Sequence, residues 1–158
     1  MGEFRSFLTE LGFTDVQTCI QSGNAVFSSP ISTDGAHSLM SQAFPARFGF
    51  LPKMMLLTAE ALAAAITGNP FADRDFDPAR LHAGFMTEEA DSVAMARVAA
   101  RPRLSEEYAV WGRMFHMSTP DLPGASKFAE GLELALKAPV TFLNWRTVLA
   151  LQNVMIRD

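Results

Sequence analysis

Helical and extended hydrophobic spacings alternate along this chain, and their order constrains the fold more than any other feature. The first apolar stripe has the spacing of one helix face: Phe4, Phe7, Leu8 and Leu11. Gly12 follows it as a helix-ending glycine. The first half then predicts strands over 16–20 and 25–28, a helix over 33–48, a strand over 51–57 and a helix that Thr58 caps and that runs to 66.

A similar order restarts after residues 69–78, a charged run between Pro70 and Pro78 that is typical of a linker. The sequence of the second half predicts a strand over 81–86, a helix over 87–100 and a hairpin of 108–111 with 114–117. It then predicts a helix over 126–136, an extended segment near Val140 and a helix over 145–156 that Asn144 caps. Both halves fit the βαββαβ order of a ferredoxin-like unit if the first strand of the first copy is absent. The sequence therefore predicts an α+β protein with two ferredoxin-like halves in tandem, 1–72 and 79–158, the second ending in the C-terminal helix.

Composition excludes several classes of protein. Hydrophobic residues make up 49% and charged residues 19% of the 158 residues, which argues against intrinsic disorder. One cysteine, Cys19, cannot form an internal disulfide, and a net charge of −4 argues against a nucleic-acid partner. Residues 1–11 lack the apolar run of a signal peptide, and the most apolar stretch, 61–66, is far shorter than the roughly 20 residues of a membrane helix. We therefore expect a cytoplasmic protein with no membrane partner.

Six short runs occur in an order and spacing that resemble one bacterial family, domain of unknown function 1697. They are Leu11-Gly12-Phe13, Ile20-Gln21-Ser22-Gly23-Asn24, Arg47-Phe48-Gly49-Phe50, Asn69-Pro70-Phe71, Ser126-Lys127 and Asn144-Trp145-Arg146-Thr147. The resemblance covers nearly the whole chain and implies tandem ferredoxin-like α+β units. No activity is established for that family, so the resemblance implies a fold and almost no function.

Members of the family usually open with a strand and a glycine-rich turn, whereas this sequence begins at Met1-Gly2-Glu3-Phe4, in the first helix. The first strand of a ferredoxin-like sheet is central, so its loss leaves backbone groups unpaired at about 1–3 kcal/mol each. Either the true start lies upstream, or repacking or a partner chain closes the gap. We predict a homodimer or a larger assembly.

Two cations at predicted helix starts form the most specific candidate site. Lys127 would follow Ser126 in the first turn of one helix, behind the flexible Gly124, and Arg146 would follow Asn144 in the first turn of another. A cation in the first turn is unfavourable by about 0.3–1 kcal/mol because of the helix dipole, which suggests that a negatively charged ligand binds there. We therefore predict an anion site that takes a phosphate-bearing small molecule. The simpler alternative is that both cations reach into solvent and that Ser126 and Asn144 are ordinary caps.

Other candidates carry weaker signals. Gln21, Ser22 and Asn24 form a secondary polar group at one hairpin tip, although turn chemistry alone explains such residues. The acidic run 73–77 resembles a calcium loop but has Pro78 where glycine is required.

The histidines and the cysteine give no catalytic or metal pattern. His82 and His116 could serve as acid and base only if they were neighbours, which their spacing does not show, and Cys19 is typical of a small core residue. We assign no catalytic residues, no metal and no cofactor.

Three function classes remain on the sequence alone, and whether the protein is an enzyme stays open. A non-enzymatic ligand-binding or interaction module with an anion site comes first, because no catalytic constellation is visible. An enzyme acting on a phosphorylated or anionic small substrate comes second and rests on Ser126, Lys127, Asn144 and Arg146. A nucleic-acid binder comes third, because the charge is acidic and no RNA-binding aromatic motif occurs.

Overall fold

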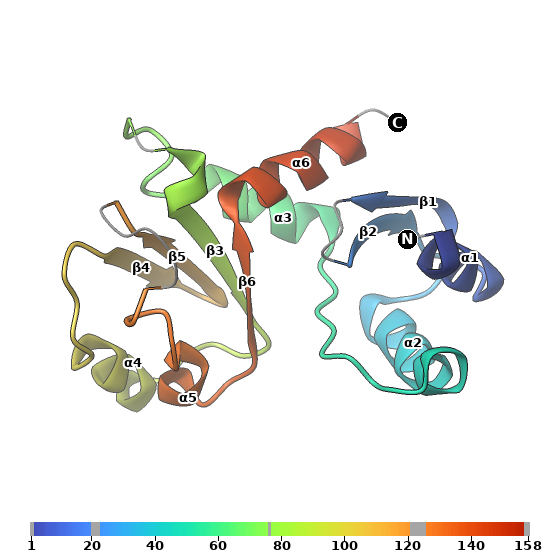
Figure 1. The fold of residues 1–158 in the computed structure, drawn as a ribbon, viewed down its shortest axis with the longest axis horizontal. Coiled ribbons are helices and arrows are strands. Elements are labelled where there is room, and N and C mark those ends of the chain that lie inside the picture. The colour runs from blue at the N-terminus through green and yellow to red at the C-terminus, as the bar shows by residue number, and fades with distance from the viewer. Residues whose placement is uncertain (1, 20–22, 76, 121–125, 157–158) are drawn as a thin grey trace. The chain divides into compact units, whose positions relative to one another are not determined.

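The structure is a computed structural model that describes residues 2–19, 23–75, 77–120 and 126–156. Its chain forms two compact units. The first contains Met1–Ala63 and Leu149–Asp158, and the second contains Ala64–Val148. We describe each unit by itself. The fold is α+β, with a two-stranded sheet in the first unit and a four-stranded antiparallel sheet in the second (Figure 1).

The first unit begins with α1 (Gly2–Glu10), the hairpin of β1 (Thr14–Cys19) and β2 (Asn24–Ser28), and α2 (Thr33–Phe48). Helix α2 has the predicted bounds because both of its ends are capped. The Ser32 side chain accepts a hydrogen bond from the backbone N–H of Gly35, and Gly49 ends the helix at φ 78°. Helix α3 (Ala59–Thr67) follows the predicted cap, since Thr58 Oγ1 accepts from the N–H of Ala61 at 3.1 Å.

The predicted strand over 51–57 is wrong, because this segment is neither helix nor strand (Figure 1). It still contacts the core, since Met54 and Leu56 pack against the buried cluster of the first unit. That cluster joins α1 and α2 to the inner face of the hairpin: Phe7, Leu8, Phe13, Val16, Ala36, Met40 and Phe44. A strand exists only by pairing its backbone with another strand, and apolar periodicity does not supply that partner.

The second unit contains the 3₁₀ helix η1 (Pro78–Arg80), β3 (Leu81–Met86), α4 (Ser92–Ala99), β4 (Glu107–Trp111), β5 (Met114–Ser118), α5 (Leu132–Leu136) and β6 (Val140–Asn144), and α6 (Trp145–Ile156) starts in it. Its strands lie in the order β4-β5-β3-β6, with every neighbouring pair antiparallel. The strand predictions for 81–86, 108–111 and 114–117 are confirmed to within one residue.

Two predicted helices of this unit are shorter than expected. The helix predicted over 87–100 begins only at Ser92, because Asp91 caps it by accepting from the N–H of Ala94 at 2.6 Å. The helix predicted over 126–136 is reduced to α5, because Gly131 turns the chain at φ 73°.

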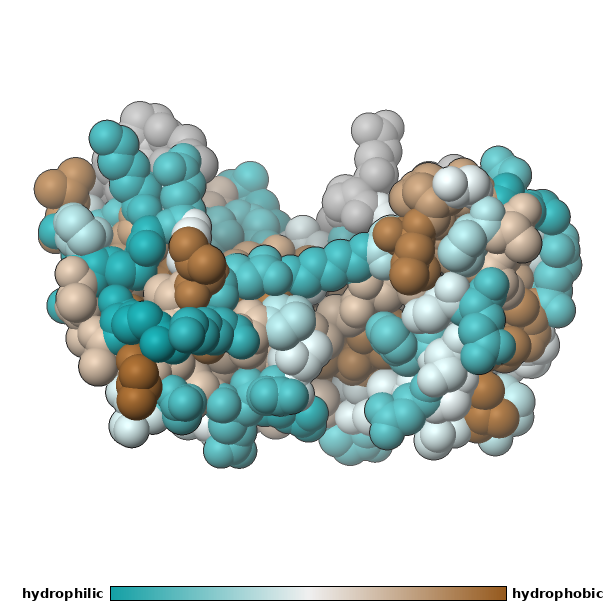
Figure 2. Space-filling view, turned by 90° about the horizontal axis from the view of Figure 1, so that it is seen from below, coloured by the Kyte–Doolittle hydropathy of each residue, from teal (hydrophilic) through white to brown (hydrophobic). Residues whose placement is uncertain are grey.

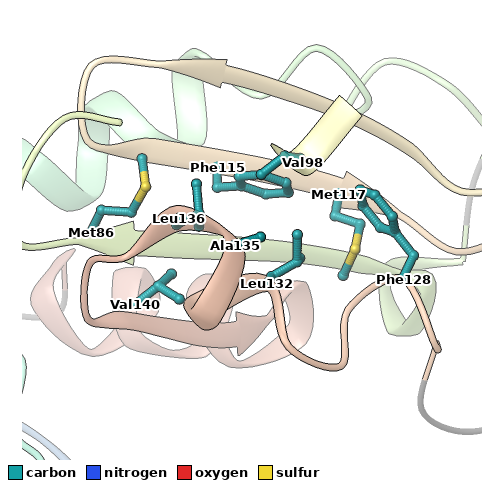
Figure 3. Close-up of a cluster of buried hydrophobic side chains, with 9 residues drawn as sticks. All are labelled: Met86, Val98, Phe115, Met117, Phe128, Leu132, Ala135, Leu136 and Val140. Atoms are coloured by element: carbon teal, nitrogen blue, oxygen red, sulfur yellow. The ribbon is translucent and has the colours of Figure 1, made fainter. Parts of the chain in front are cut away.

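One face of the four-stranded sheet packs against α4 and α5. Figure 3 shows nine side chains converging there from the strands, from both helices and, in the case of Phe128, from the turn before α5: Met86, Val98, Phe115, Met117, Phe128, Leu132, Ala135, Leu136 and Val140. The centre of the sheet is close-packed, since a Cβ on Gly84 of β3 would lie 2.6 Å from the Phe142 ring of β6. Only glycine leaves room for that ring.

Candidate functional site

The candidate anion-site residues that the structure describes belong to one end of the sheet of the second unit. At that end, Glu107 of β4 lies opposite Ser118 of β5, Ser118 lies opposite Leu81 of β3, and the neighbouring His82 lies opposite Asn144 of β6. Asn144 therefore ends β6 at this edge. Ser126 is held at the same end of the sheet but at its opposite edge, because its hydroxyl donates a hydrogen bond to Glu106, the residue before β4.

Asn144 and Arg146 are held by hydrogen bonds within the protein. Asn144 Oδ1 accepts from the backbone N–H of Arg146 at 3.0 Å, which is the expected capping bond of α6. The Asn144 amide also donates to the carbonyl of Ala79 at 2.9 Å. The Arg146 guanidinium donates to Asp77 Oδ1 at 3.0 Å, and both side chains are more than half exposed.

Asp77 is therefore a negative partner for the cation at the start of α6. Its carboxylate also accepts from the backbone N–H of Ala79 at 2.9 Å, as the cap of η1. The Ala79 N–H and then the Arg146 guanidinium hold the pKa of Asp77 below its usual range. The position of Arg146 at a helix start suggested that a ligand supplies the negative charge, whereas the chain itself supplies one.

Ser126 begins a turn, and the prediction that it starts a helix is wrong. Its hydroxyl accepts from the backbone N–H groups of Phe128 and Ala129, at 3.1 and 3.2 Å. The same hydroxyl donates to Glu106 Oε1 at 2.6 Å, and both residues are buried. The Ser126 hydroxyl, followed by the N–H of Leu104, lowers the pKa of the Glu106 carboxyl.

Arg101, just beyond α4, stabilises the turn over residues 127–130 that precedes α5. Its guanidinium donates to the carbonyls of Lys127, Phe128 and Glu130. In a helix those carbonyls would accept from N–H groups four residues further along the chain. Lys127 itself is exposed, and no helix dipole opposes its charge, because α5 starts only at Leu132.

Asn144 and Ser126, which precede the two cations in the chain, are held at opposite edges of the four-stranded sheet. Asn144 lies on β6 and Glu106 precedes β4, and these strands form opposite edges of the four-stranded sheet. Three strand spacings, or about 14 Å, separate the edge strands β4 and β6. Gly124 lies outside the described residues, as do Gln21 and Ser22 of the secondary polar group. Asn24, the remaining member of that group, begins β2 in the first unit.

The histidines do not form an acid–base pair. His82 lies opposite Met117 on β5, whereas His116 lies opposite Ala83 on β3, so the two imidazoles point to opposite faces of the sheet. His116 is fully buried, and its Nε2 donates to the carbonyl of Ala65 at 3.0 Å. Burial lowers the pKa of both histidines. The buried Nδ1 of each histidine has no hydrogen-bond partner within the described part of the protein.

Two acidic residues of this sheet end, Asp77 and Glu106, were not among the residues predicted for the anion site, although Asp77 belongs to the acidic run 73–77. Asp77 had a local signal, because an aspartate directly before a proline at a helix start is typical of a cap. Glu106 had none, since its partner Ser126 is 20 residues away. No group of three His, Cys, Asp or Glu side chains that could hold a metal ion occurs in the described ranges. None of the described helices is long and apolar enough to cross a membrane.

One depression lies on the surface of the second unit. It is shallow and is lined by residues that were not candidates: Gly131, Glu133, Leu134, Lys137, Ala138 and Pro139. On the face drawn in Figure 2, hydrophobic residues stand in separate small groups among hydrophilic ones. Scattered exposure of this kind is normal for a protein surface and does not mark a docking site.

Comparisons with known proteins identify the family. The family described as "Protein of unknown function (DUF1697)" matches residues 1–116. The chain belongs to this family. One solved structure, that of the conserved bacterial protein SP0830 from Streptococcus pneumoniae, is similar to the chain with a TM-score of 0.71 and 25% sequence identity. The match covers 100% of this chain and 89% of SP0830, and no curated protein matches. The family resemblance is thus confirmed over residues 1–116, the range that contains the first four of the six motifs.

Proposed function

We propose that this DUF1697 protein is a non-enzymatic interaction module that assembles as a homodimer or larger through the sheet of its first unit. One observation carries the proposal: in the described residues the first unit has a two-stranded sheet, while the second unit has four strands. A two-stranded hairpin is marginal by itself, and an open strand edge is a template for pairing with another chain.

The proposal includes the tandem arrangement of ferredoxin-like halves, 1–72 and 79–158. The second half supports it by its element order, β3-α4-β4-β5-α5-β6, and by its strand order, β4-β5-β3-β6. In this arrangement β5 lies between β3 and β4, which a helix connects, as in a split β-α-β unit. The first half has the order α1-β1-β2-α2 followed by the segment 51–57, which is the same order without a counterpart of β3.

The edge formed by β2 is better suited to pairing than the edge formed by β1. In β1 the register shifts between Thr14 and Gln17, and Asp15 has a φ of 54° and an exposed side chain. Bulges and charges are the usual protection of a strand edge. The sequence of β2, Asn24–Ser28, contains no charge and no proline.

Light scattering after gel filtration tests this function. We expect at least twice the 17.3 kDa mass of one chain at micromolar concentration. Val26→Lys places a charge on β2 and should shift the protein to the monomer, because lysine blocks edge pairing. Asp15→Lys on the protected strand is the matched control and should stay assembled. A monomer at every concentration, with native circular dichroism, contradicts the proposal.

An anion site is the second candidate, and it also serves the alternative of an enzyme that acts on a phosphorylated or anionic substrate. Its support is the N-terminus of the 12-residue helix α6, where Arg146 follows the capping residue Asn144, and the exposed Lys127 beside Ser126. Thermal-shift titration with pyrophosphate tests it. The Lys127→Glu and Arg146→Glu double variant should lose any shift, and an unchanged shift in that variant rejects the site.

A further inference from the structure

We infer that His116 is an acid-sensitive switch, whose neutral imidazole holds the end of α3 against the sheet of the second unit and whose imidazolium releases it. The segment that the switch controls, residues 64–75, is called the cover segment. It contains the end of α3 and the turns that follow, and all of it belongs to the second unit. This inference goes beyond the proposed function and does not depend on assembly.

The side chain of His116 is enclosed between the sheet and the segments that cover it. Its neighbours on β5, Phe115 and Met117, point into the cluster with α4 and α5, so the imidazole points to the other face. There its Nε2 donates to the carbonyl of Ala65, in the cover segment, at 3.0 Å. Its ring also contacts that of Trp145, the first residue of α6, with the ring centroids 6.4 Å apart. The exposed fraction of His116 is 0%.

The hydrogen bond to Ala65 fixes the protonation state of the imidazole. A carbonyl only accepts, so Nε2 carries the proton and Nδ1 is the bare nitrogen of a neutral ring. An imidazolium would have a second N–H at Nδ1, which is buried and has no hydrogen-bond partner among the described residues. Burying a charge without a partner is very costly. The closed arrangement is therefore stable only with the neutral ring.

The face of the sheet that carries His116 does not present an unpaired carboxylate to it in the described ranges. The residues directly opposite His116 are Ala83 on β3 and Ala109 on β4. Glu107 lies on the same face, two residues before Ala109, and its carboxylate accepts hydrogen bonds from Arg74 at 2.8 and 2.9 Å. Because the guanidinium offsets this negative charge, Glu107 does not stabilise a proton on the imidazole.

The helices and the cover segment add few charges near the imidazole. In α3 the titratable residue is Glu60, in the first turn and five residues before Ala65. In α6 the charged residue is Arg146, a cation that pairs with Asp77. The cover segment adds two exposed aspartates, Asp73 and Asp75. Burial therefore lowers the pKa of His116, and the Ala65 carbonyl opposes this effect to a smaller degree.

Other contacts of the cover segment do not respond to mild acid, so the release is local. A Cβ on Gly68 would lie 2.8 Å from the Trp111 ring, Phe71 is buried, and Arg74 pairs with Glu107 at 2.8 Å. Apolar contacts do not titrate, and a glutamate protonates only near pH 4. Acid thus weakens the attachment at His116 and leaves these three in place. We expect the end of α3 to open while the sheet stays folded.

Hydrogen exchange of single amides, followed by NMR, tests the switch. The N–H of Gly68 bonds to the carbonyl of Ala64 at 2.9 Å and reports on the end of α3. The N–H of Ala100 bonds to the carbonyl of Ala96 at 3.0 Å, at the end of α4 on the other face, and is the matched control. The open state has a histidine with an ordinary pKa of about 6.5. The protection factor of Gly68 should therefore fall about tenfold between pH 7.5 and 5.5, and that of Ala100 should not.

Two variants assign the effect to one imidazole. His116→Gln keeps a donor for Ala65 but does not titrate, so the protection factor of Gly68 should become independent of pH. His82→Gln, on the opposite face of the same sheet, should keep the parent profile. The nitrogen chemical shifts of the parent imidazole do not depend on either variant folding and should show the Nε2–H tautomer at pH 7.5. An equal fall for Gly68 and Ala100, a constant Gly68 protection factor in the parent, or an Nδ1–H tautomer overturns the switch.

Discussion

The imidazole Nε2 of His116 donates a hydrogen bond to the backbone carbonyl of Ala65 at 3.0 Å and so ties the end of α3 to β5 inside the second unit. Because Nε2 carries the proton and the side chain is fully buried, the neutral tautomer is the one that fits. A second proton would have to go to Nδ1, which has no partner among the described residues. The stability of this unit should therefore depend on pH.

Acidification through pH 6.5 should destabilise the protein. Burial lowers the folded-state pKa of His116, and also that of His82, below the unfolded value of about 6.5, so the unfolded chain binds more protons. Stability is then complete above about pH 6.5 and falls below it, by up to about 1.4 kcal/mol per pH unit for each histidine. Urea unfolding between pH 5 and 7.5 measures this slope. His116→Gln keeps a donor for Ala65 and should flatten the profile, whereas an equal slope in both proteins would contradict a role for His116.

Ser126→Ala should destabilise the second unit by about 1–3 kcal/mol, because it leaves a buried Glu106 oxygen and two turn N–H groups without their partner. Chemical denaturation at pH 7 measures the loss. Lys127→Ala is the matched control, since its side chain is exposed, and it should stay within about 0.5 kcal/mol of the parent. Equal stabilities for the two variants would show that the Ser126–Glu106 bond is not structural.

Gly84→Ala should cost about 1–3 kcal/mol, because the added methyl would lie 2.6 Å from the Phe142 ring in the middle of the sheet. Gly2→Ala is the control at the first residue of α1, where nothing lies within 4 Å of an added Cβ. Thermal unfolding of the two variants makes the comparison. Truncating the ring in a Gly84→Ala, Phe142→Leu double variant should recover part of the loss; a purely additive pair would contradict a direct clash.

Asp77→Asn should make Arg146 more available to an added anion, because the carboxylate that pairs with the guanidinium at 3.0 Å is neutralised. Pyrophosphate should then raise the melting temperature more than it does in the parent protein. Asp73→Asn changes the charge equally at an exposed position of the same loop and is the control. The same response to pyrophosphate in both variants would place the anion elsewhere.

The elements that could be predicted are those specified by local interactions. Helix α2 has its predicted bounds because Ser32 and Gly49 cap it within a few residues, and β3 has its predicted bounds as well. The hairpin of β4 and β5 turns at Gly112, whose φ of 55° suits glycine. The end of α5 at Leu136 was predicted, whereas its start was not: Gly131 turns the chain at φ 73°, and the turn before it is held by hydrogen bonds from Arg101, 27 and 29 residues earlier in the chain.

The features of the candidate site also separate into those specified by local sequence and those specified by tertiary contacts. The sequence by itself identified the family, the α+β class, the cap at Asn144 and the cations Lys127 and Arg146, since each depends on residue type and near neighbours. Only the tertiary structure decided that Asp77, 69 residues away, pairs with Arg146 and that His82 and His116 face opposite sides of a sheet. It also decided that residues 51–57 form no strand. Apolar spacing records which face of a segment is buried, whereas strand pairing depends on backbone partners that the spacing does not encode.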